Sequence, residues 1–147
     1  AKSSILWHFG SKNGLLLAVV EDIFDGMQQL IAKVSLTSPD KKERLKSAML
    51  LLAAEMQKTP EANTLLISFI VNQTIDKTIN NHIKEMYDSY RLFIKSILVA
   101  ADVEVNELYS AAILAFVDGA FIQWYLQPDK IDLKELFVQV VDIIIPE

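Results

Sequence analysis

The chain has no cysteine among its 147 residues, and it has only two histidines, four glycines and four prolines. Without cysteine it can form neither a disulfide framework nor a thiolate metal site, and this fits a reducing cytoplasm. The scarcity of glycine and proline leaves long segments uninterrupted. Because 52% of the residues are hydrophobic, we expect an ordered chain with one sizeable core rather than a disordered one.

Signals of catalysis and of membrane insertion are also missing. The sequence contains no glycine-rich phosphate loop, no nucleophile elbow and no His-x-x-x-His pair. The histidines, His8 and His82, fall in separate predicted helices, so we expect no enzyme, no metal site and no cofactor. Residues 111–126 form the longest apolar stretch, which is shorter than the roughly 20 residues of a membrane span. The first 14 residues lack the apolar core of a secretory signal, and we expect a cytoplasmic protein without membrane contact.

Charge is distributed unevenly along the chain. The net charge is −5, yet Lys2, His8 and Lys12 lie in an amino-terminal segment of 12 residues that contains no acid. All 19 acidic residues follow it. An acidic body repels a polyanion, so any contact with nucleic acid is expected at the amino-terminal end.

Breakers and capping residues divide the sequence into helices, and no segment has a convincing strand pattern, which predicts an all-α fold. A first helical unit ends at Gly10, and Ser11 is the expected N-cap of a long helix over residues 12–34. Pro39 is expected in the first turn of the next helix. The predicted helices after the first unit begin at Lys12, Pro39, Pro60, Asp76, Val105 and Leu133.

The last two predicted helices are more apolar than a single core requires. Residues 105–126 are apolar around nearly the whole circumference, and residues 133–145 leave only a narrow polar strip. A second copy of the chain is expected to cover the excess, with two helices from each copy forming a four-helix bundle. Asp118 either has a buried partner and a shifted pKa or faces solvent beside Glu107. The expected interface residues are Ala112, Gly119, Phe121, Ile122, Leu136, Val140 and Ile144.

The first dozen residues carry a resemblance. Ser4, Ile5, Trp7, His8, Phe9 and Lys12 match, in order and spacing, the recognition helix and following turn of the TetR family of transcriptional regulators. The resemblance implies a homodimer with a remnant of a helix-turn-helix DNA-binding domain at residues 1–14 and an effector-binding and dimerisation domain at 15–147. Leu6 departs from the family, which often has an aromatic there. The DNA contacts that the resemblance implies are Lys2, Ser3, Ser4, Trp7, His8 and Lys12.

The same resemblance implies two bracing helices before Ala1, so this chain alone is expected to bind operator DNA weakly or not at all. It also implies that a small, largely apolar effector binds among the central helices, tilts the helix of residues 12–34 and releases the DNA. Taken singly, each candidate pocket residue also suits a filled core. The candidates are Met49, Phe69, Asn72, Gln73, Met86, Tyr90, Phe93 and Phe116.

Two alternatives remain open at this stage. One is a helical dimerisation or interaction module with a filled core and neither ligand nor DNA binding. The other is a small enzyme or a carrier of apolar molecules. An enclosed space of a few hundred cubic ångströms among the central helices would favour a ligand sensor, whereas a close-packed interior would favour the interaction module.

Overall fold

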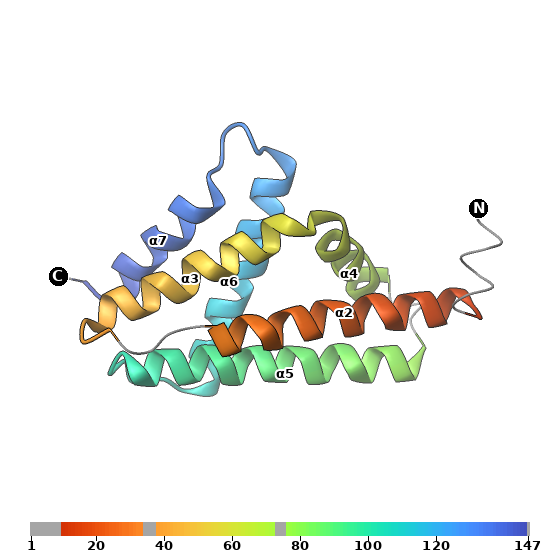
Figure 1. Cartoon of the computed structure of the whole chain (residues 1–147), viewed down its shortest axis with the longest axis horizontal. Coiled ribbons are helices and arrows are strands. Elements are labelled where there is room, and N and C mark those ends of the chain that lie inside the picture. The colour runs from red at the N-terminus through yellow and green to blue at the C-terminus, as the bar shows by residue number, and fades with distance from the viewer. Residues whose placement is uncertain (1–9, 34–37, 73–75, 147) are drawn as a thin grey trace.

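A computed structural model describes residues 10–33, 38–72 and 76–146 (Figure 1). All regular secondary structure in these residues is α-helical, which confirms the predicted all-α class for the described part of the chain. The helices are α2 (Lys12–Lys33), α3 (Lys41–Lys58), α4 (Pro60–Asn72), α5 (Lys77–Ala100), α6 (Glu107–Leu126) and α7 (Leu133–Ile144).

The two longest helices, α2 and α5, lie side by side and run in the same direction along the long axis of the molecule (Figure 1). The helix α3 runs back in the opposite direction, and α4 turns away from its end. The helix α6 crosses behind this layer and packs on α5, whereas α7 lies alongside α3 and runs in the opposite direction. The central helices are therefore arranged around a common interior.

Most helix starts follow from the sequence signals. Gly10 has a φ of 71°, in the left-handed region that favours glycine. The Ser11 hydroxyl accepts a hydrogen bond of 3.0 Å from the N–H of Gly14, which confirms Ser11 as the cap of α2. Pro39 lies before α3 rather than in its first turn. The cap is Asp40, whose carboxylate accepts hydrogen bonds from two N–H groups of that turn at 2.9 and 3.1 Å. Because the helix begins after this cap, Pro39 precedes it.

The core lies where α5, α6 and α7 turn their apolar stripes toward α3. In α5 the apolar residues that recur every three or four positions are buried, namely Ile79, Ile83, Met86, Tyr90, Ile94 and Ile97. In α7, Phe137 is 0% exposed, and its ring centre lies 6.0 Å from that of Phe116 in α6. This packing holds α6 and α7 together and fixes the floor of the interior.

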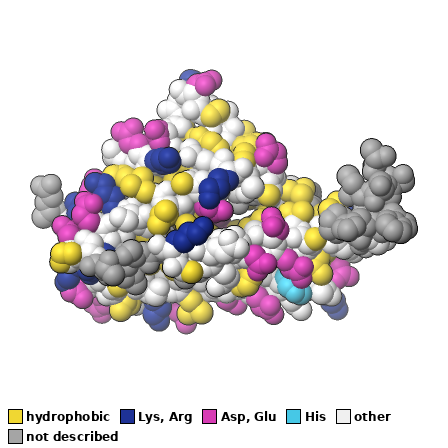
Figure 2. Space-filling view, viewed as in Figure 1, with side chains coloured by type: hydrophobic (Ala, Val, Ile, Leu, Met, Phe, Trp, Pro, Cys, Tyr) yellow, Lys and Arg dark blue, Asp and Glu magenta, His cyan; other side chains and the backbone are white. Residues whose placement is uncertain are grey.

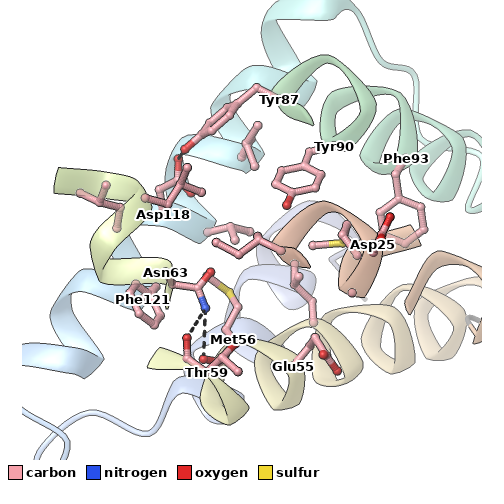
Figure 3. Close-up of a pocket in the computed structure, with 18 of the residues that line it drawn as sticks. Asp25, Glu55, Met56, Thr59, Asn63, Tyr87, Tyr90, Phe93, Asp118 and Phe121 are labelled. Carbon is pink, nitrogen blue, oxygen red and sulfur yellow. Dashed lines mark hydrogen bonds between the residues drawn. The ribbon is translucent and has the colours of Figure 1, made fainter. Parts of the chain in front are cut away.

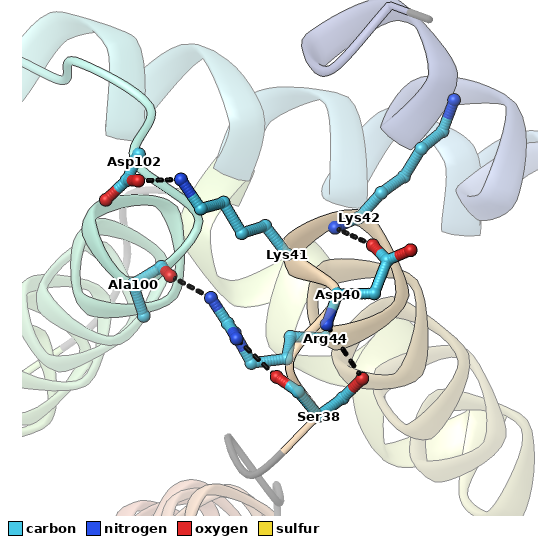
Figure 4. Close-up of polar contacts among 7 residues, drawn as sticks. All are labelled: Ser38, Asp40, Lys41, Lys42, Arg44, Ala100 and Asp102. Atoms are coloured by element: carbon cyan, nitrogen blue, oxygen red, sulfur yellow. Dashed lines mark hydrogen bonds and ion pairs between the residues drawn. The ribbon is translucent and has the colours of Figure 1, made fainter.

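A polar clamp joins the start of α3 to the end of α5 (Figure 4). The guanidinium of Arg44 donates to the carbonyl of Ser38 and, at 2.5 Å, to that of Ala100. Lys41 forms an ion pair with Asp102, which has a φ of 52° in the turn after α5. Because Arg44 satisfies carbonyls at both helix ends, the clamp holds these two ends together.

In the described part of the chain, α6 is the one helix long and apolar enough to cross a membrane by length and composition. It begins at Glu107, two residues after the predicted start at Val105, because Asn106 caps its first turn by accepting the N–H of Tyr109. The core helix of a soluble protein passes the same test. Here 33% of the apolar stretch of α6 is buried within the chain, and its buried residues include Leu114, Val117 and Phe121.

Candidate ligand-binding cavity

A cavity of about 330 Å³ lies among α2, α3, α4, α5 and α6 (Figure 3). Cavities that bind small molecules have volumes of roughly 300–1,000 Å³, so this one suits a compact ligand. Its walls are mainly apolar, and every one of these five helices contributes to them. The apolar side chains around it include Met27, Leu52, Leu66, Phe93, Leu114 and Phe121.

One end of the cavity opens to solvent. Asp22, Asp25 and Gln29 of α2, and Thr59 at the end of α3, are exposed and also line the cavity. Figure 2 shows this face: the surface is hollowed between α2 and α3, and acidic side chains are grouped over the middle of α2. The mouth of the cavity is therefore polar and acidic.

Glu55 of α3 lies behind this mouth, close to α2. Its Oε1 atom would be 3.7 Å from a Cβ built on Gly26, which is an ordinary van der Waals contact. Its other oxygen, Oε2, pairs with Lys58 at 2.5 Å. Deeper along α4, the Asn63 amide donates to the carbonyl of Thr59 at 3.1 Å (Figure 3), which holds the turn between α3 and α4 against the cavity.

The opposite end of the cavity carries a hydrogen-bonded carboxylate. The Tyr87 hydroxyl of α5 donates to Oδ2 of Asp118 in α6 at 3.0 Å (Figure 3). Burial raises the pKa of the Asp118 carboxyl, and the hydrogen bond from Tyr87 offsets part of that rise. Burial, followed by the nearby Asp118 charge, raises the pKa of Tyr87 and of Tyr90 well above the ordinary value. Both phenols therefore stay protonated wherever the chain is folded at ordinary pH.

Tyr90 is placed to meet a ligand. Its ring centre lies 6.0 Å from that of Tyr87, its side chain points into the cavity, and the residue is only 9% exposed (Figure 3). No described residue forms a hydrogen bond with its hydroxyl. The hydroxyl faces the open cavity, so it can form a hydrogen bond with a polar group of a bound molecule.

Comparison with protein-family models, with curated proteins and with solved structures finds no match to this chain. The likeness to TetR regulators therefore depends on the motif at the amino terminus, and the function has to be argued from the cavity itself.

The structure brings two of the candidate pocket residues together. Tyr90 and Phe93 of α5 both line the cavity. Met49 and Met86 are buried in the core at 5% and 1% exposure and do not reach the cavity lining. Phe116 packs on the ring of Phe137 instead. The side chains of Phe69 and Asn72, and all of Gln73, lie outside the described residues.

The acidic part of the lining was not predicted. Asp22, Asp25 and Glu55 lie on faces that the hydrophobic pattern assigns to solvent, and no signal in the sequence shows that these faces border a cavity. Asp118 did stand out, because it interrupts an apolar helix. Of its two predicted environments the structure has the first: the carboxylate is bonded to Tyr87 and lines the cavity, with its pKa raised.

The candidate interface residues divide into three groups by exposure. Ala112 and Ile122 are exposed on α6. Phe121 and Val140 are only 1% and 7% exposed, because they face the interior of their own chain, and Phe121 lines the cavity. These two side chains are therefore unsuitable for an interface between copies in this conformation. Gly119, Leu136 and Ile144 are partly exposed.

Among the candidate DNA contacts, only Lys12 lies in the described residues. It is the first residue of α2 and is exposed. The other five, Lys2, Ser3, Ser4, Trp7 and His8, lie outside the described residues.

Proposed function

We propose that the chain is the effector-binding and dimerisation region of a TetR-type transcriptional regulator, a repressor that binds operator DNA as a homodimer in its full-length form and is released by a small effector. One observation carries the proposal. The helix α2, which begins directly after the segment that resembles a recognition helix, also forms one wall of the cavity.

This arrangement supports a direct mechanical link between ligand and DNA. Ile23 and Met27 of α2 line the cavity, about three and about four turns after Lys12. A ligand that binds better to one tilt of α2 than to another shifts the population toward that tilt, by no more than its difference in affinity. In a dimer, such a tilt changes the separation of two recognition helices, which must match half-sites about 34 Å apart.

Exposed apolar side chains on the last two helices support the homodimer. Leu108 and Leu126 of α6 are 81% and 71% exposed, and Ile143 of α7 is 77% exposed. Ile122 is 39% exposed on α6. A second copy that presents the same two helices would cover these side chains in a symmetric bundle.

Binding of a neutral apolar fluorophore such as Nile red tests the sensor half of the proposal. The purified chain is expected to bind the probe, and Val117→Phe is expected to weaken binding at least ~10-fold, because Val117 is 3% exposed and lines the cavity. The new ring would occupy existing space, so stability should change little. The same change at Val141, which is 0% exposed and outside the lining, should destabilise by about 1–3 kcal/mol through overpacking.

A wild-type chain that binds no apolar probe would refute the sensor and leave the interaction module. The DNA half is tested separately, with the chain joined to whatever its reading frame encodes before Ala1. Selection from a random duplex pool should then return an inverted repeat, as a symmetric dimer requires. A pool without enrichment would refute operator binding.

A further inference from the structure

The charged side chains that line the cavity are all carboxylates, and one of them, Glu55, is paired with Lys58 at 2.5 Å. Asp22, Asp25, Glu55 and Asp118 line it, and the described lining includes no lysine, arginine or histidine. Two of these carboxylates stand at the mouth, and Asp118 stands at the inner end beside Tyr87. An anionic molecule would meet like charges from Asp22 and Asp25 at the mouth and from Asp118 at the other end, which is unfavourable in a partly buried site.

Asp118 lacks a cationic partner. Its Oδ2 accepts from Tyr87, and no described lysine or arginine forms an ion pair with either of its oxygens. Asp118 and Tyr87 also line a second groove together with Lys84 and Arg91. Arg91 pairs with Asp88 there, and neither cation forms an ion pair with Asp118. A carboxylate removed from water without a counter-charge is destabilising, and a positively charged ligand would supply that charge.

Aromatic rings surround the same space. Tyr87, Tyr90, Phe93 and Phe121 line the cavity, and Figure 3 shows them arranged around its interior, with the Tyr90 hydroxyl directed inward. The faces of such rings attract organic cations, most strongly where water is excluded. The unpartnered Tyr90 hydroxyl can in addition accept a hydrogen bond from an ammonium N–H.

We propose that the effector is an apolar organic cation, an ammonium on a hydrocarbon or aromatic body, whose charge lies between Asp118 and the rings of Tyr87 and Tyr90. This inference rests on the proposed function only in taking the cavity as the effector site. It narrows the expected effector from any small apolar molecule to one that carries a positive charge.

Three probes of matched shape test the charge preference on the unmodified chain. They are benzyltrimethylammonium, its neutral carbon isostere neopentylbenzene, and the anion phenylmethanesulfonate. Calorimetry and thermal stabilisation should show the cation binding at least ~10-fold more tightly than the neutral isostere, and the anion not binding. Equal binding of cation and neutral probe would overturn the charge preference while leaving a ligand-binding cavity. Failure of all three, and of Nile red, would remove the cavity's function as well.

Removal of the negative charge of Asp118 tests whether this residue causes the preference for a cation. Asp118→Asn keeps the size and the acceptor oxygen and should weaken the cation about 10-fold, with neopentylbenzene unaffected. Asp129→Asn is the matched control, because Asp129 is exposed in the turn between α6 and α7 and does not line the cavity. It should leave both affinities unchanged. A cation affinity that is the same in the two variants would overturn the assignment of the charge to Asp118.

Discussion

The hydrogen bond between Tyr87 and Asp118 provides the sharpest test of the inner end of the cavity. Tyr87→Phe removes the one hydroxyl that donates to this carboxylate and changes little else. A hydrogen bond to a charged group contributes about 1.5–3 kcal/mol, and one between neutral groups about 0.5–1.5 kcal/mol. Tyr87→Phe should therefore lower the free energy of unfolding by about 2 kcal/mol at neutral pH, and by about 1 kcal/mol when made together with Asp118→Asn.

The variant Asp118→Asn should itself stabilise the ligand-free chain at neutral pH. Burial raises the pKa of Asp118 above its ordinary value of 3.8, so the folded chain holds this proton more tightly than the unfolded chain. The stabilisation from the protonated form is complete below 3.8 and is lost as the pH rises through the folded pKa. Asparagine has no such loss, so the gain from Asp118→Asn should be absent in acid and appear as the pH rises.

Urea denaturation of the wild type, the two single variants and the double variant, followed by circular dichroism, measures both effects. The four free energies of unfolding should be compared at several pH values between 4 and 8, without ligand. An effect of Tyr87→Phe that is equal in the presence and absence of Asp118→Asn, at every pH, would refute the charged hydrogen bond. A destabilising Asp118→Asn at neutral pH would refute the argument from burial.

Three further predictions follow from burial and exposure. Phe137→Ala should destabilise by about 3–5 kcal/mol in urea, because loss of its 0% exposed ring leaves a void where α7 packs on α3 and α6; a change under 1 kcal/mol would contradict this packing. Ile122→Lys should shift the chain to monomer in sedimentation, whereas Leu92→Lys should not, because Leu92 is 67% exposed on α5 rather than on either of the last two helices. The same oligomeric state in both variants would contradict an interface at Ile122. In alkaline titration, Tyr87 and Tyr90 should form tyrosinate only as the chain unfolds, because burial raises both pKa values. The stabilisation from the two protonated phenols is full below pH 10 and is lost above it. Titration of all tyrosines near pH 10, without unfolding, would contradict this prediction.

Local signals in the sequence predicted the helices well, because each acts within a few residues. Pro60 opens α4, and Asp76 caps α5 through the N–H of Thr78 at 2.8 Å, as expected for these residue types. The apolar stripe of α5 is buried as its spacing predicts. Pro39 failed as a start signal because Asp40, one residue later, is the stronger cap for the same turn.

The cavity could not be predicted in the same way. The spacing of hydrophobic residues identifies the face of a helix that is buried. It does not show whether that face packs against other side chains or borders a cavity, because this depends on how the helices cross. Met86 and Tyr90 share the stripe of α5, yet only Tyr90 reaches the cavity. For the same reason Phe121 was assigned to a dimer interface, since both environments require the same apolar side chain.

A substitution at Gly26 tests the stability of α2 and the shape of the cavity in two separate measurements. It lies inside α2 and lines the cavity, and a glycine within a helix costs about 1 kcal/mol relative to alanine. The added methyl group of Gly26→Ala would make only ordinary contact, at 3.7 Å, with Glu55. Gly26→Ala should thus stabilise the chain by about 0.5–1 kcal/mol.

The same methyl group would narrow the cavity between α2 and α3, so Gly26→Ala should also weaken binding of benzyltrimethylammonium. Gly119→Ala is the matched control: it lies inside α6, has open space around an added Cβ, and does not line the cavity. It should stabilise by a similar amount without changing ligand affinity. If both variants stabilise and neither affects binding, Gly26 serves only the approach of α3 to α2. A loss of affinity confined to Gly26→Ala would show that this glycine keeps the cavity open at a cost in helix stability.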